Sequence, residues 1–104
     1  MTGRAAGART ALVQGVLQDH RPGVRFVGSI NLQARDEGVY YTWRLESEDG
    51  EFLASTGQVV SYRVIPLGQD PFEFALSHAL EGIRRYRINR VRPFRVEASQ
   101  WGPA

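Results

Sequence analysis

Hydrophobic and polar residues alternate along the middle of this chain, as they do in strands that bury one face of a sheet. In residues 24–35 the apolar side chains occupy even positions, from Phe26 to Ala34, and polar side chains fill most of the odd ones. Residues 39–48 alternate in the same way, and residues 51–64 form a third extended stretch. The pattern therefore predicts three consecutive strands.

Asp49-Gly50, between the second and third stretches, is a strong signal for a two-residue hairpin, because both central residues of such a turn need a positive φ. Pairing across this turn brings apolar side chains of neighbouring strands onto the same face. The predicted cross-strand pairs are Leu45 with Ala54, Trp43 with Thr56 and Val39 with Val60. The three strands should thus form an antiparallel meander.

Two other segments have apolar residues at helical spacing. A short helix is predicted over residues 10–20, with its apolar positions at Leu12, Val13, Val16 and Leu17. A longer helix is predicted over residues 71–87, because Asp70 is a good N-cap residue and Pro71 fits the first helical position. A short final strand is predicted over residues 93–99.

These elements predict an α+β or α/β fold. We expect an N-terminal helix, the antiparallel meander, and a helical crossover to a fourth strand that lies parallel to the first, since such crossovers are right-handed. The chain has 104 residues, the size of one domain. We place this domain at residues 10–104 and expect a flexible N-terminus over residues 1–9.

The composition excludes several kinds of chemistry. The chain has no cysteine, so disulfides, thiolate metal sites and thiol nucleophiles are ruled out. No apolar run approaches the roughly 18–20 residues that cross a bilayer, and the N-terminus lacks the apolar core of a signal peptide. We therefore expect a cytoplasmic protein without membrane association.

Charge is distributed unevenly along the chain. Residues 1–81 carry 7 Arg and 10 Asp or Glu, a net charge of −3, whereas residues 82–104 carry 6 Arg and one Glu, a net charge of +5. Arginine binds phosphate in a bidentate fashion and stacks on bases, so this basic segment is a candidate nucleic-acid interface. The predicted contact residues are Arg84, Arg85, Arg87, Arg90, Arg92, Arg95 and Tyr86.

Several local sequences are similar, in their order and spacing, to those of the ribonuclease H-like family. They are Phe26-Val27-Gly28-Ser29 in the first strand, Gly38 at the start of the second, Phe72-Glu73-Phe74 in the helix, and Val96-Glu97-Ala98-Ser99 in the last strand. The resemblance covers about residues 24–101 and implies a truncated version of that fold.

In that family a cluster of carboxylates holds two divalent metal ions. The resemblance assigns three of the acid positions to Val27, Glu73 and Ala98, so only Glu73 retains a carboxylate. One carboxylate does not hold two such ions. We therefore expect a catalytically degenerate member, with no catalytic residue, metal or cofactor, in which Glu73 instead forms a capping box with Asp70.

Three functions are compatible with these observations. The first is a non-catalytic ribonuclease H-like module that binds nucleic acid through the arginine-rich segment. The second is a homodimer, or a regulatory subunit bound to another protein, that assembles through an exposed sheet edge. The third is a double-stranded-RNA-binding-type domain, whose α-β-β-β-α order matches most of the predicted elements.

Overall fold

The structure is a computed structural model that describes residues 7–17, 24–88 and 92–102. A long meander of strands is followed by one helix and a returning strand. The elements are β1 (Ala8–Leu17), β2 (Val24–Ala34), β3 (Gly38–Ser47), β4 (Phe52–Ser61), the 3₁₀ helix η2 (Tyr62–Val64), α1 (Pro71–Arg85), β5 (Arg87–Ile88) and β6 (Arg92–Trp101).

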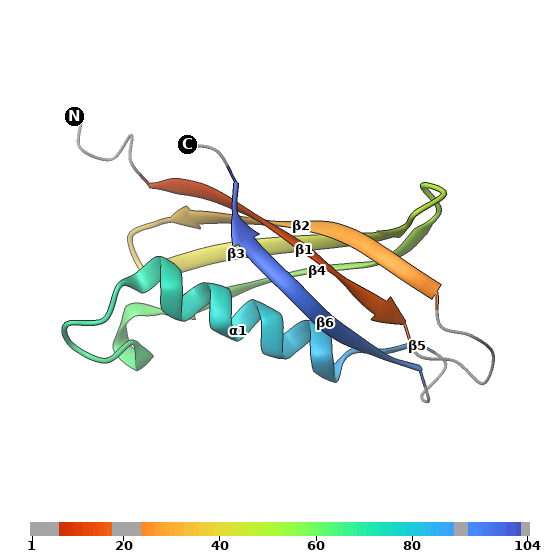
Figure 1. Cartoon of the computed structure of the whole chain (residues 1–104). Helices are drawn as coiled ribbons and strands as arrows, with labels where there is room; N and C mark the ends of the chain where they lie inside the picture. Colours follow the sequence, from red (N-terminus) through yellow and green to blue (C-terminus); the bar gives the residue numbers. More distant parts are fainter. Residues whose placement is uncertain (1–6, 18–23, 89–91, 103–104) are drawn as a thin grey trace.

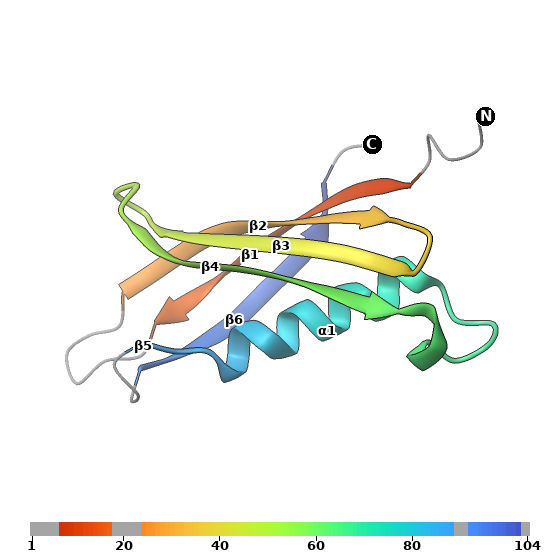
Figure 2. The same cartoon turned by 180° about the vertical axis from the view of Figure 1, so that it is seen from behind.

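The strands form one sheet in the order β4-β3-β2-β1-β6-β5, and all neighbours are antiparallel. Helix α1 packs on one face of this sheet against β2, β3 and β6, as Figure 1 shows from the front and Figure 2 from behind. The other face has no covering element in the described part of the chain. No helix within it is long and apolar enough to cross a membrane.

The core lies between α1 and the sheet. Strand residues that face the helix alternate with residues on the open face, so each strand contributes every second side chain to the core. Phe26 of β2 and Phe94 of β6 meet edge to face, with ring centroids 5.3 Å apart. The largest fully buried side chains are Trp43, Tyr41, Phe26, Phe94, Ile30, Leu32, Leu45, Ile83 and Val39.

The predicted hairpin is present, but its loop has three residues, Glu48 to Gly50, and not two. Ser47 N–H donates to Glu51 O at 2.8 Å, and Gly50 N–H donates to Ser47 O at 2.9 Å. Gly50 has a φ of 88°, the positive value for which glycine is favoured. All three predicted cross-strand pairs are present: Val39 with Val60, Trp43 with Thr56, and Leu45 with Ala54. The bulge in this strand pair lies beyond them, between Leu45 and Glu46.

The predicted long helix is also present as α1. The carboxylate of Asp70 accepts a hydrogen bond from the Phe72 N–H at 2.9 Å, and Pro71 occupies the first turn, so the N-cap prediction is confirmed. The Glu73 carboxylate, expected in a capping box, accepts a 2.7 Å hydrogen bond from Trp101 Nε1. Glu73 therefore ties the start of the helix to the end of β6.

The predicted N-terminal helix is wrong, because residues 8–17 form strand β1. Ala11, Val13 and Leu17 face the core, whereas Leu12 is exposed on the opposite face. The apolar residues fit helical spacing and strand alternation about equally well. Backbone pairing with β2 on one side and β6 on the other decides between the two.

The expected parallel fourth strand is wrong as well. The final strand, β6, runs antiparallel to its neighbour β1, which lies between β6 and β2. Because β1 occupies the place beside β2, the returning strand cannot pair with β2, the first strand of the predicted meander. The fold is thus an antiparallel sheet covered by one helix.

The α-β-β-β-α order of a double-stranded-RNA-binding-type domain is absent, because the first element is the strand β1 and not a helix. Of the flexible N-terminus expected over residues 1–9, residues 1–6 lie outside the described part, and Ala8 and Arg9 belong to β1.

Candidate interaction surface at the sheet edge

Two of the predicted nucleic-acid contacts, Arg84 and Arg85, lie at the end of α1 and share one carboxylate. Arg85 Nε is 3.0 Å from Glu81 Oε2, and Arg84 Nη1 is 3.7 Å from Glu81 Oε1. These pairs join neighbouring turns of the helix, as expected for residues three or four apart. Glu81 therefore offsets part of the positive charge at this end of the helix.

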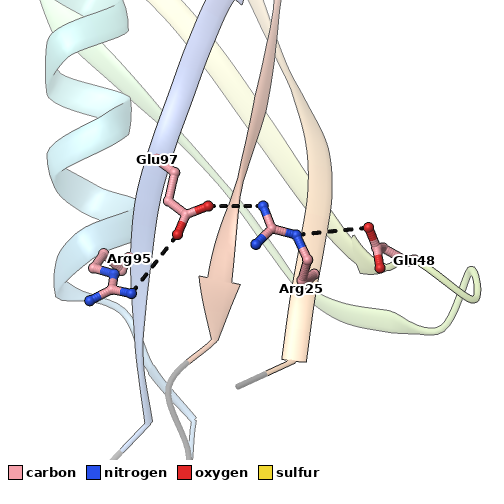
Figure 3. Close-up of polar contacts among 4 residues, drawn as sticks. All are labelled: Arg25, Glu48, Arg95 and Glu97. Atoms are coloured by element: carbon pink, nitrogen blue, oxygen red, sulfur yellow. Dashed lines mark hydrogen bonds and ion pairs between the residues drawn. The ribbon is translucent and has the colours of Figure 1, made fainter. Parts of the chain in front are cut away.

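Arg95 lies on the other face of the sheet. It follows the buried Phe94 and so projects away from α1. Its Nη2 is 3.9 Å from Glu97 Oε2, and Glu97 Oε1 accepts a 2.8 Å bond from Arg25 Nη2. Arg25 also reaches Glu48, at 3.9 Å. Figure 3 shows these four side chains as one chain of alternating charges across the sheet, which leaves little net charge for phosphate.

Tyr86, the aromatic residue expected to stack on a base, has protein rings as neighbours instead. Its ring meets Trp43 edge to face at 5.4 Å and lies 6.1 Å from Phe94. Arg87 belongs to β5 and Arg92 to β6, but their side chains lie outside the described part, as does all of Arg90. Of the predicted arginines whose side chains are described, Arg84 and Arg85 lie at the end of α1 and Arg95 lies on the opposite face of the sheet, so these three do not share one surface.

The three positions that the ribonuclease H-like resemblance assigned to metal-binding acids do not lie at one site. Val27 and Ala98 line a shallow groove of about 280 Å³ on the open face, whereas Glu73 is on α1, across the sheet, bonded to Trp101. Among the described residues, no three His, Cys, Asp or Glu side chains gather into a metal-binding group.

One titratable pair is partly buried between α1 and the sheet. Tyr41 Oη lies 2.9 Å from His78 Nδ1 and 3.4 Å from Gln58 Oε1. Burial raises the pKa of the Tyr41 hydroxyl above its ordinary value, because the charged phenolate would lose water contacts there. This pair joins the helix to β3, and we assign it a structural role.

Sequence reasoning expected an exposed sheet edge for assembly but did not assign it to β4. In the described part of the chain this strand pairs with β3 alone, and five consecutive residues, Ser55 to Val59, are exposed. From Phe52 to Ser61 the strand contains no charged residue and no proline. Natural edge strands usually carry such residues because an open edge is a template for another strand.

The hydrogen-bond pattern shows which backbone groups β4 leaves open. Tyr62 N–H donates to Glu37 O at 3.2 Å, and register places Val60 opposite Val39. In an antiparallel pair, every second residue bonds to its neighbour, so the even residues of β4 bond to β3. Within the regular ladder from Ala54 to Ser61, the outward-facing N–H and C=O groups therefore belong to Ser55, Gly57, Val59 and Ser61.

Exposed apolar side chains gather on β4 and on the segment directly after it. Leu67 is fully exposed and Phe52 is 50% exposed. The complete set in this region is Phe52, Val59, Tyr62, Val64 and Leu67. Phe52 lies at one end of β4 and the other four residues lie near or beyond its opposite end, so each end of the strand offers apolar area to a partner.

Comparison with known proteins identifies no family, because no family model, curated protein or solved structure matches this chain. The ribonuclease H-like resemblance therefore gains no support beyond the local sequences that suggested it. The function has to be argued from the surface geometry.

Proposed function

We propose that this chain is a non-enzymatic assembly module in which the β4 edge accepts a strand from another polypeptide. The observation that carries this proposal is a regular ladder from Ala54 to Ser61 with an outer side that carries neither charge nor proline. Such an edge offers a row of backbone donors and acceptors to a partner strand. A cytoplasmic location remains a prediction from the sequence.

Strand addition fits the energetics of this edge. Four residues of the regular ladder present outward backbone groups, and each new hydrogen bond contributes about 0.5–1.5 kcal/mol. The exposed side chains of Phe52 and Tyr62, at the two ends of β4, add apolar area that a partner can cover. Backbone bonds would supply affinity, and these side chains would supply selectivity.

Nucleic-acid binding is the competing function, and the charge distribution supports it less. Arg84 and Arg85 pair with Glu81, and Arg25 and Arg95 pair with Glu97. Phosphate contacts on such a surface would have to replace these acidic partners. Binding of a mixed-sequence oligonucleotide with a steep salt dependence would favour this alternative.

A labelled peptide with the sequence of residues 52–61, and with lysines added at both ends for solubility, tests strand addition. We expect its fluorescence anisotropy to rise when the protein is added. Ser55→Pro should abolish that rise, because proline removes one outward N–H without breaking the ladder to β3. Ser55→Ala keeps the N–H and serves as the matched control.

Circular dichroism establishes that both variants are folded. Strand addition at β4 is wrong if the peptide does not bind the unaltered protein. It is also wrong if the folded Ser55→Pro variant binds the peptide as well as Ser55→Ala does.

A further inference from the structure

One cation lies against two aromatic rings where the start of β1, the end of β6 and the start of α1 meet. The guanidinium carbon of Arg9 is 5.3 Å from the centroid of the Phe72 ring and 4.8 Å from that of the Trp101 ring. Its Nη1 is 3.8 Å from Asp70 Oδ2. Aromatic rings and a carboxylate around one positive charge are the groups with which proteins recognise organic cations.

We propose that Phe72, Trp101 and Asp70 form a cage for a guanidinium group, which Arg9 fills as an internal ligand. An arginine side chain of a partner polypeptide takes the same place when Arg9 leaves. The cage contains no residue of β4. This inference therefore goes beyond strand addition and does not depend on it.

The walls of the cage are held in place by contacts that do not involve Arg9. Trp101 Nε1 donates a 2.7 Å hydrogen bond to Glu73 Oε2, and the Trp101 backbone belongs to the ladder between β6 and β1. Phe72 lies in the first turn of α1, where its N–H donates to Asp70 Oδ1 at 2.9 Å. The cage is therefore pre-formed, and a ligand that replaces Arg9 does not have to order it.

The electrostatics of the cage favour a cation over a neutral group. The start of a helix carries partial positive charge, which by itself repels a cation. Asp70 and Glu73 place two carboxylates at the start of α1, and the faces of aromatic rings are electron-rich. A neutral ligand of the same shape would gain little from either group.

Arg9 is held by contacts that an external arginine can replace. The Arg9 and Asp70 side chains are 45% and 47% exposed, and their separation is longer than a hydrogen bond. Ion pairs at exposed positions contribute little, and single cation–π contacts there are weak. An external arginine makes the same contacts and therefore competes with Arg9 for the cage.

A nuclear magnetic resonance titration that follows the indole N–H of Trp101 tests the cage. The probe is Nα-acetylarginine methylamide, a blocked arginine that represents one residue of a peptide. In Arg9→Ala, which empties the cage, we expect a saturable shift of this signal. The unaltered protein should need about tenfold more probe, because occupancy by Arg9 lowers the apparent affinity in proportion to the empty fraction.

Two matched probes and one further variant identify what the cage recognises. Nα-acetylcitrulline methylamide has the shape of the arginine probe without its charge and should give no saturable shift. Nα-acetyllysine methylamide has the charge without the planar group and should bind more weakly. Arg9→Ala/Phe72→Leu lacks one ring and should bind the arginine probe about two- to fivefold more weakly than Arg9→Ala.

Circular dichroism establishes that each variant is folded, and Arg9→Thr, which keeps a residue suited to a strand, is the second variant that empties the cage. A shift that stays linear in the probe, or that is equal for the arginine and citrulline probes, overturns the guanidinium site. Equal affinities of Arg9→Ala and the unaltered protein overturn Arg9 as its internal ligand. No saturation of the unaltered protein at about a hundredfold higher probe concentration overturns displacement by an external arginine. None of these results depends on peptide binding at β4, so the two proposals can fail separately.

Discussion

Gly15 and Gly82 provide a matched test of the fold, because adding the same methyl group should have opposite effects at the two sites. Gly15 lies in β1, beside β6, and a Cβ atom there would be 2.0 Å from the Arg95 carbonyl oxygen and 2.9 Å from Phe26 Cε2. Gly82 lies in α1, where a Cβ atom would be 3.9 Å from Tyr41 Oη.

The expected magnitudes follow from these distances. Non-bonded atoms prefer separations of roughly 3.5–4.0 Å, so Gly15→Ala must push β6 away from β1 or distort both strands. Overpacking costs about 1–3 kcal/mol, and a clash with backbone belongs at the upper end, about 3 kcal/mol. Gly82→Ala makes only ordinary contacts and should gain up to about 1 kcal/mol in helix propensity.

Urea unfolding measures the change in the free energy of unfolding, and thermal unfolding measures the change in Tm; both are followed by circular dichroism. For a domain of this size, 1 kcal/mol corresponds to a change in Tm of about 4–8 °C. We therefore expect Gly15→Ala to lower Tm by about 12–24 °C and Gly82→Ala to raise it by a few degrees. A Gly15→Ala variant as stable as the unaltered protein would refute the placement of β1 against β6.

Two further predictions concern burial and pH. Leu17→Ala should cost about 3 kcal/mol and Leu12→Ala about 1 kcal/mol or less in urea unfolding, because Leu17 is 4% exposed and Leu12 is 44% exposed; equal losses would contradict the strand assignment. Because the folded state raises the pKa of Tyr41 above 10.0, the stability that depends on its neutral form is full below that pH and is lost as pH rises through the raised value. Tyr41→Phe should lose less stability than the unaltered protein as the pH rises above about 10, and parallel losses would exclude Tyr41 as the cause.

The parts of the fold that local signals determine could be predicted from the sequence. Asp49-Gly50 specified the position of a turn, although the register also depends on the bulge between Leu45 and Glu46. Asp70 with Pro71 specified the start of α1. Each signal acts within a few residues of the structure that it predicts. Contacts with distant segments do not change the outcome there.

The N-terminal segment could not be assigned in this way. Val13 and Leu17 fit the core face of a helix and of a strand, and Gly15 weakens a helix without excluding it. Its strand identity depends on backbone bonds to β2 and to β6, which is some 80 residues away along the chain. Because one wrong element displaced its neighbours, the predicted position of the last strand was wrong as well.

At the candidate site, too, contacts between nearby residues could be predicted and contacts between distant residues could not. The pair between Glu81 and Arg85 is four residues apart, so the sequence could have indicated that this arginine has a partner. The bond between Arg25 and Glu97 joins residues 72 positions apart, and only the folded chain brings them together. The acidic partner of Arg25 could therefore not be identified from local sequence.

The position of β1 also determines which strands become edges. With β1 inside the sheet, β4 ends it on one side, and β6 with the short β5 ends it on the other. The β6 side contains Pro93, Arg95, Glu97 and a bulge, all features that discourage strand addition, whereas β4 has no charge or proline. This difference between the edges favours β4 over β6 as the edge that accepts a partner strand.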